Sequence, residues 1–433
     1  MNLRGTFAWN TAGTFLLKVA SAGLSFLISL ILARRLGAVG YGAYSYAIAL
    51  VGLLAIPAIM GLDRLLIRNI ASYQVQSAWG MMKGLLRWAN GMALILSLAI
   101  AALSFLAGIT FAKGMDRQML SAFLVALILL PILTLTRLRQ ASLQGLHKII
   151  PGQLPELLLQ PALFIILLMA SYLSLRRGLS VELVLLLHIT AAVCAFVVGA
   201  WLLYTNLPQD VRMATPTYHK QTWIVSATPL FLFAAMQTVN SQADIILLGA
   251  IKGAKAVGIY SAANRLAALI SVILIAVNTP LAPTVARLYA EGDMKRLQEV
   301  ITKTVRLITL VSLPLAGSML LFGDRFLLIF SSEFLRGRTA LSILSIGQIF
   351  NATMGSVGLI LTMTGYERYA AMGVGISAVL NIILNACFIP LWGMEGAALA
   401  TSISMIALNI ALALVVKRKL GINSTILQRG TTG

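Results

Sequence analysis

The sequence predicts an all-α integral membrane protein with about twelve transmembrane helices. Of its 433 residues, 59% are hydrophobic and only 11% are charged, and the mean hydropathy is +0.91. Soluble domains carry roughly 25% charged residues. The apolar residues fall into runs near the ~20 residues that cross a bilayer as a helix. Transmembrane strands would show ten-residue segments of alternating polarity, which are absent.

Each predicted span is followed by a short charged or turn-forming segment. Most of the 33 Lys and Arg residues fall on one side of the membrane when the N-terminus is placed in the cytoplasm. The positive-inside rule therefore predicts that both termini are cytoplasmic, and the formal net charge of +20 needs no nucleic-acid partner. The twelve predicted spans are 8–33, 42–62, 85–111, 119–136, 150–172, 181–204, 224–250, 257–283, 305–330, 339–364, 369–390 and 395–416.

An internal repeat divides the chain near its middle. Residues 37–47 (GAVGYGAYSYA) align with residues 253–263 (GAKAVGIYSAA) at an offset of 216, and each copy lies in the turn that leads into the second span of its half. Six spans per half give the two halves the same orientation, as in transporters that place substrate between two lobes. We expect an N-terminal lobe at 1–208, a cytoplasmic linker at 209–222 and a C-terminal lobe at 223–433.

Polar residues follow one face of the first span. Thr14, Lys18 and Ser21 recur every three or four residues, and Asn10, Ser25 and Ser29 extend the series. A cation at this depth is costly unless it faces water or a partner. The pattern favours a water-filled cavity, although packing of small residues between helices also explains the serines and threonines.

A second polar group lies in the seventh and eighth spans. Gln237, Asn240 and Asp244 share a helix face, while Asn264 stands next to Arg265 at a similar depth. We predict that Asp244 and Arg265 pair, either as a structural lock or as a charge switch. With Lys18, the expected cavity is net positive and favours an anionic substrate group such as a phosphate or acidic sugar.

Two further cations, Arg64 and Arg68, follow the second span at its cytoplasmic edge. They are interpreted as loop anchors or as the point where lipid headgroups gain access. In the fifth span, Pro155 interrupts the apolar run, which is typical of a bend.

Motifs for catalysis are missing from the sequence. There is no P-loop, no metal-binding spacing of His, Cys, Asp or Glu, and no nucleophile motif, and the loops are too short for a catalytic domain. Cys194 and Cys387 lie inside apolar runs, so no disulfide framework is expected. We predict a transporter without a metal or other cofactor, and not an enzyme.

Four segments resemble bacterial polysaccharide flippases of the Wzx type. This family belongs to the multidrug/oligosaccharidyl-lipid/polysaccharide (MOP) exporter superfamily. The resemblance covers essentially the whole chain, and Lys18 matches the basic residue that such flippases often carry in the first span. The segments are NTAGTFLLKV at 10–19, ILARRLG at 31–37, NSQAD at 240–244 and VGIYSAA at 257–263.

The resemblance implies a V-shaped fold like that of the multidrug and toxin exporters (MATE), in the bacterial cytoplasmic (inner) membrane. It implies alternating access, driven by an ion gradient or the membrane potential, that moves a polyprenyl-diphosphate-linked oligosaccharide for O-antigen, capsule or exopolysaccharide synthesis. Lys18 and Arg265 would attract the diphosphate, and Asp244 would balance Arg265 or take part in coupling to a proton or sodium ion. Membrane lipids, a polysaccharide polymerase and a chain-length regulator are the other implied partners.

Two alternatives remain at this point. One is a cation-coupled multidrug antiporter of the same superfamily, which would rely on cavity carboxylates; only Asp244 clearly qualifies. The other is a membrane-embedded glycosyltransferase or polymerase, for which no carboxylate site or large loop is evident.

Overall fold

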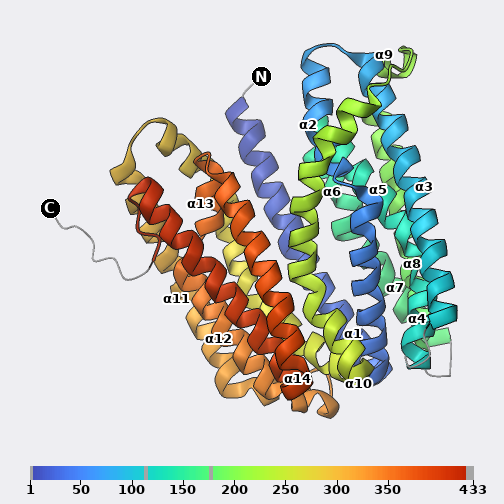
Figure 1. Ribbon diagram of the computed structural model, residues 1–433, viewed down its shortest axis with the longest axis vertical. Helices are drawn as coiled ribbons and strands as arrows, with labels where there is room; N and C mark the ends of the chain where they lie inside the picture. Colours follow the sequence, from blue (N-terminus) through green and yellow to red (C-terminus); the bar gives the residue numbers. More distant parts are fainter. Residues whose placement is uncertain (1–2, 112–115, 175–178, 426–433) are drawn as a thin grey trace. The chain divides into compact units, whose positions relative to one another are not determined.

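The computed structural model describes residues 3–111, 116–174 and 179–425. In these ranges every regular element is a helix (Figure 1), which confirms the all-α prediction. Eight of the described helices are long and apolar enough to cross a membrane, or nine if the bent pair α4 (Arg117–Ala126) and α5 (Leu129–Gly145) is one span. The chain is thus a multi-pass membrane protein.

Three of these helices are too long to be single spans, and each breaks at a glycine. The breaks are at Gly37 in α1 (Leu3–Ile59), Gly253 in α10 (Lys220–Ala290) and Gly393 in α14 (Glu367–Leu420), with φ of 68°, 80° and 60°. At 1.5 Å per residue, the 57 residues of α1 would reach about 85 Å, far beyond the hydrocarbon thickness. All three breaks fall where the sequence predicts a turn between spans. The total of twelve spans stays a prediction.

The chain forms two compact units, each described here separately. The first comprises Met1–Ile28 and Ala43–Gln242, and the second comprises Ser29–Gly42 and Ala243–Gly433. A short piece of α1 therefore belongs with the C-terminal half, and the start of α10 belongs with the N-terminal half. The predicted lobes at 1–208 and 223–433 and the predicted linker at 209–222 stay predictions.

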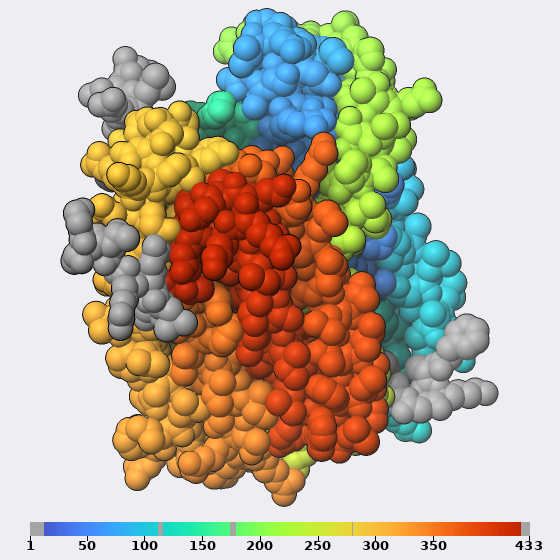
Figure 2. All heavy atoms as spheres, turned by 60° about the vertical axis from the view of Figure 1, so that its left-hand side comes forward, coloured from blue at the N-terminus to red at the C-terminus, as the bar shows by residue number. Residues whose placement is uncertain are grey.

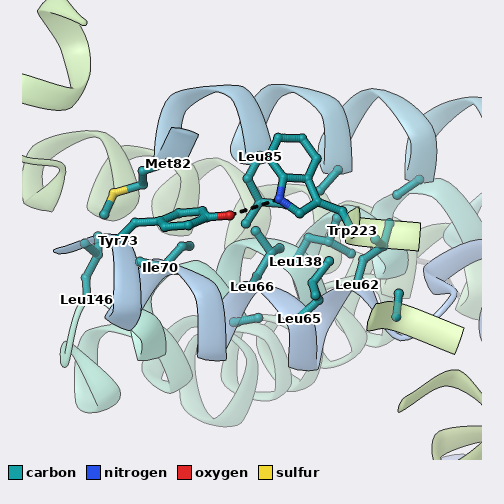
Figure 3. Packing of buried hydrophobic residues seen from close by; sticks show 14 of the residues in the cluster. Leu62, Leu65, Leu66, Ile70, Tyr73, Met82, Leu85, Leu138, Leu146 and Trp223 are labelled. Atoms are coloured by element: carbon teal, nitrogen blue, oxygen red, sulfur yellow. Dashed lines mark hydrogen bonds between the residues drawn. The ribbon is translucent and has the colours of Figure 1, made fainter. Parts of the chain in front are cut away.

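The first unit has its core beneath α2. Leu62, Leu66 and Ile70 point one face of α2 into this core, and Trp223 at the start of α10 reaches it and donates an indole hydrogen bond to the Tyr73 hydroxyl at 3.0 Å (Figure 3). The contact holds the beginning of α10 in the first unit. Besides parts of α1 and α10, the elements are α2 (Leu62–Val75), α3 (Trp79–Phe111), α4, α5, α6 (Ile149–Leu154), the π-helical turn η1 (Pro155–Leu159), α7 (Gln160–Ser174), α8 (Val181–Asn206) and α9 (Gln209–Met213).

The second unit packs its helices around a core of Leu and Val side chains. In this unit α12 lies against both α11 and α14, and α13 packs against α14. Figure 2 shows α14, in orange-red to red, over much of the face of this unit that is turned to the viewer. Besides parts of α1 and α10, the elements are α11 (Met294–Leu328), the 3-10 helix η2 (Ser332–Gly337), α12 (Arg338–Met354), α13 (Val357–Met363) and α14.

Local sequence explains where several helices begin. Ser180 accepts a hydrogen bond from the Leu183 amide at the start of α8, and Asp293 does the same for Arg296 at the start of α11. Such caps satisfy amides that have no partner within the helix. The long apolar helices of both units carry many exposed large hydrophobic side chains, including Ile376 on α14. Such side chains are expected on surfaces that face lipid.

Within the second unit, Ala38 and Gly42 of the first copy of the repeat pack directly against Ala254 and Gly258 of the second copy. A Cβ added at Gly42 would lie 2.7 Å from the Ala254 carbonyl carbon and 2.7 Å from the Gly258 nitrogen. A Cβ at Gly258 would lie 2.9 Å from the Ala38 carbonyl carbon and 3.0 Å from the Gly42 nitrogen. Each copy thus offers a small residue, three intervening residues and a glycine, which lets two helix backbones touch. The two copies of the repeat therefore form a helix crossing between α1 and α10, in which each helix makes equivalent contacts.

Candidate functional site

The predicted polar face of the first span lies on α1 in the first unit. Lys18 is exposed, Thr14 and Ser21 are half-buried, and Leu17 beside them is buried. None of the hydrogen bonds or ion pairs among the described residues involves Lys18. Its ammonium group is therefore available to an anion, and the role of this face in a cavity stays a prediction. The side chain of Asn10 lies outside the described residues.

The structure brings together two predicted residues from different helices of the first unit. Arg64 on α2 donates a hydrogen bond from Nη2 to Gln237 Oε1 on α10 at 3.2 Å, and its Cζ lies 4.5 Å from the centroid of the Phe233 ring. A glycine at residue 61 permits this approach, since a Cβ there would lie 2.6 Å from the Phe231 nitrogen. One contact uses one of the five donors of a guanidinium. The guanidinium is held on an aromatic face with donors left for an anion.

The other two polar residues of this group are less constrained. Arg68 is exposed and donates from Nε to Asn69 Oδ1 at 3.4 Å. Asn240 is half-buried one turn after Gln237. Both stay candidates on the strength of the sequence pattern alone.

Asp244 lies in the second unit and is 4% exposed. Its Oδ2 accepts a hydrogen bond from the Tyr260 hydroxyl at 2.5 Å, and its Oδ1 accepts from the Ile245 amide at 2.8 Å. The Tyr260 hydroxyl is also 3.4 Å from Thr401 Oγ1 on α14. These bonds make a compact polar cluster that joins both parts of α10 to α14 inside the membrane-spanning region.

The predicted Asp244–Arg265 ion pair was wrong. Among the described residues no ion pair links them; the carboxylate binds Tyr260 instead, and Arg265 is exposed. Similar depth in two spans allows a pair but does not set the side of the helix from which each chain projects. Asn264 is half-buried beside Arg265. Arg265 stays a candidate for an anionic ligand on the strength of the sequence pattern.

Sequence reasoning missed a buried ion pair in the first unit. Arg139 on α5, which follows the predicted fourth span, is 3% exposed and pairs with Glu156 on η1, which is 15% exposed. Gly199 on α8 makes room for it, since a Cβ there would lie 2.6 Å from the Arg139 Nε. A lone carboxylate in the predicted fifth span was the pattern that could have revealed the pair, because such a group needs a partner.

No group of three or more metal-ligating side chains occurs within the described ranges. Cys194 and Cys387 are free thiols. The candidate residues are therefore exposed cations and buried polar groups that are hydrogen-bonded. Such groups can bind a ligand and exchange partners during a conformational change.

Comparison with known proteins places these residues in a family. Residues 7–289 match the family described as polysaccharide biosynthesis protein, over well more than half of the chain. The chain belongs to this family. Residues 229–387 also match the MatE family, so the segment that carries Asp244 and Arg265 is common to both matches.

Curated relatives of this family member include flippases. The "probable low-salt glycan biosynthesis flippase Agl15" of Haloferax volcanii is 27% identical over 92% of this chain and 80% of its own length. The "lipid II flippase MurJ" of Bacillus subtilis is 23% identical over 99% of this chain and 85% of its own length.

Solved structures share the fold. An inward-facing MATE family multidrug transporter of the MOP superfamily has a TM-score of 0.77 at 16% identity, covering 92% of this chain and 94% of its own. Lipid II flippase MurJ in an inward closed conformation has a TM-score of 0.73 at 16% identity, covering 95% and 87%. Both confirm the MATE-like fold that is predicted for this member of the polysaccharide biosynthesis family.

Proposed function

We propose that the protein flips a polyprenyl-diphosphate-linked oligosaccharide across the cytoplasmic membrane of a bacterium by alternating access, for polysaccharide biosynthesis. The observation that carries the proposal is a set of cations within apolar helices that have no carboxylate partner among the described residues. Lys18 and Arg265 are exposed, and Arg64 is held by an amide and an aromatic ring. An unpaired charge in a span is costly and is a functional-site candidate by default.

The chemistry of these cations favours a diphosphate over a cationic drug. Guanidinium and ammonium groups make charge-assisted hydrogen bonds to phosphate oxygens, with fork geometry at arginine. Asp244 is buried against Tyr260, so it offers no open anionic surface to a drug. Its suggested role is coupling to a cation gradient, with a proton or sodium ion. The distribution of Lys and Arg favours a cytoplasmic location for both termini. A polysaccharide polymerase and a chain-length regulator are the proposed protein partners.

Flipping of a fluorescent polyprenyl-diphosphate-linked N-acetylglucosamine in proteoliposomes tests the proposal. Lys18→Ala and Arg265→Ala should each lower the rate about tenfold or more, since hydrogen bonds to charged groups contribute ~1.5–3 kcal/mol. Lys18→Arg should keep much of the rate because the charge is retained. Lys295→Ala, which removes an exposed cation at the first turn of α11, is the matched control.

Two results would overturn the proposal. One is full flipping by both alanine variants at normal protein levels in the membrane. The other is failure of the wild type to move the probe together with protection of cells against cationic dyes, which would favour a multidrug antiporter instead.

A further inference from the structure

A histidine inside the first unit is held by hydrogen bonds at both ring nitrogens. His188 on α8 has its Nδ1 3.0 Å from the hydroxyl of Tyr44 on α1 and its Nε2 3.1 Å from Nε2 of Gln160 on α7. The ring stacks on Phe164, with centroids 4.8 Å apart and planes at 20°. His188 is half-buried, about 10 Å along its helix from Val181 at 1.5 Å per residue.

Which ring nitrogen carries the proton follows from the orientation of the Gln160 amide. The Gln160 amide nitrogen donates, so Nε2 of His188 accepts and the ring proton lies on Nδ1, directed at the Tyr44 hydroxyl. A second proton would go to Nε2 and would need an acceptor there. Rotation of the Gln160 amide by half a turn presents Oε1 in place of the nitrogen. Both protonation states can therefore be satisfied without moving the backbone.

The Tyr44 contact is tied to the internal repeat. Tyr44 and Tyr260 occupy the same position of the two copies, at the offset of 216. Tyr260 donates to Asp244 in the second unit, and Tyr44 bonds to His188 in the first. Each copy thus places its tyrosine hydroxyl on a titratable side chain of its own unit. The repeat keeps the tyrosine in both copies while the hydrogen-bond partner changes from His188 to Asp244. Packing alone does not explain why both partners are titratable.

No carboxylate among the described residues forms an ion pair with His188. Glu156 is taken by Arg139, and Glu182 accepts from Ser121 at 2.6 Å. A permanent anionic partner would hold the ring charged, whereas hydroxyl, amide and aromatic contacts leave proton binding reversible. The charged or titratable groups of the first unit on α8 and on the elements around it are Lys18, Tyr44 and Tyr46 on α1, Arg117 on α4, Arg137 and Arg139 on α5, Lys148 at the start of α6, Glu156 on η1, Tyr172 on α7, and Glu182, Cys194 and Tyr204 on α8.

We propose that His188 is a proton-binding site of the first unit, closed by Tyr44 and Gln160, and that its occupancy couples flipping to a proton gradient. The coupling part rests on the proposed function. Proton loading adds a positive charge within a membrane span and reverses the Gln160 amide, so it changes the relative stability of conformations that expose or bury the ring.

Gradient-driven accumulation of the fluorescent lipid-linked N-acetylglucosamine measures the coupling. In proteoliposomes with a difference of one pH unit, transport coupled to one proton sets a leaflet ratio of up to about tenfold. His188→Gln should bring this ratio close to one. His147→Gln and His219→Gln remove the other two histidines, both exposed, and should keep the wild-type ratio. If His188→Gln does not fold, Gln160→Leu, which removes the acceptor for the second proton, should lower the ratio instead.

Direct titration separates this inference from the proposed function. Histidine-selective ring NMR of the purified full-length protein, assigned with His188→Gln, should show His188 passing reversibly from the Nδ1–H form to the doubly protonated form as the pH is lowered. A ring that stays neutral throughout, or a flipping ratio unchanged in the folded variant, overturns the proton site. If the wild type does not flip the probe but the ring titrates, only the flippase proposal fails.

Discussion

The helix crossing between Ala38, Gly42, Ala254 and Gly258 makes a sharp prediction about stability. Gly42→Ala adds one methyl group at a contact between two backbones. That methyl would lie 2.7 Å from both the Ala254 carbonyl carbon and the Gly258 nitrogen, and nearer still to the Ala254 carbonyl oxygen. No side chain can move aside to relieve the overlap, because the opposing atoms are main chain.

The cost follows from these distances. Ordinary contact of a Cβ begins at 3.4 Å, so the backbones must separate by at least about 0.7 Å over the crossing. Overpacking of this kind costs ~1–3 kcal/mol, and the helix-forming gain of Ala over Gly returns up to ~1 kcal/mol. Gly258→Ala should cost a similar amount, since its contacts mirror those of Gly42.

The double variant distinguishes a shared contact from two separate defects. Once one methyl has pushed the helices apart, the second has less to displace, so the combined loss should be smaller than the sum. Thermal loss of the monodisperse peak in size-exclusion chromatography reports these losses as shifts of a few degrees. Gly23→Ala and Gly317→Ala are matched controls, because a Cβ at either meets nothing within 4 Å. Both should be neutral or slightly stabilised.

A Gly42→Ala protein as stable as the Gly317→Ala control would refute the reasoning. Strict additivity of the Gly42 and Gly258 losses would contradict the shared crossing even if each single variant is destabilised.

Three further changes test contacts in the first unit. Glu156→Gln should destabilise the protein by ~3–5 kcal/mol because it leaves Arg139 buried without its counter-charge, and joint replacement of both residues by Leu should recover most of the loss in the same thermal assay. Gly199→Ala should displace the Arg139 guanidinium and mimic Glu156→Gln, while adding it to Glu156→Gln should change little further. Tyr73→Phe should cost ~1 kcal/mol by removing the hydrogen bond to Trp223, with a change in tryptophan fluorescence as the second readout.

Helix positions could be predicted from sequence because hydrocarbon thickness sets a length that apolar runs must meet. The repeat also indicated where helices break, since Gly37 and Gly253 adopt positive φ at corresponding positions. What the repeat glycines do there could not be predicted. Alignment shows that Gly42 and Gly258 correspond, but only the fold shows that the two copies touch each other.

The sequence predicts which residues belong to the candidate site better than it predicts which of them contact each other. Arg64 and Gln237 were chosen for separate reasons, and the structure joins them. Asp244 was assigned the wrong partner because sequence gives depth along a helix but not the direction of a side chain across a bundle. Arg139 was overlooked because positive charge near a predicted span end is usually outside the membrane, whereas α5 continues to Gly145 and buries it.

The proposed proton binding gives the two repeat tyrosines partners whose charge changes in opposite ways. Tyr44 and Tyr260 are equivalent by position, yet one meets an imidazole and the other a carboxylate. Proton uptake charges His188 and neutralises Asp244, so the same event raises the cost of exposing one cluster to lipid and lowers it for the other. Because duplication preserved the phenol and not its partner, any coupling that uses these clusters is asymmetric. Variants at Tyr44 and Tyr260 should therefore shift the pH dependence of transport in opposite directions, a difference that two merely structural hydrogen bonds would not produce.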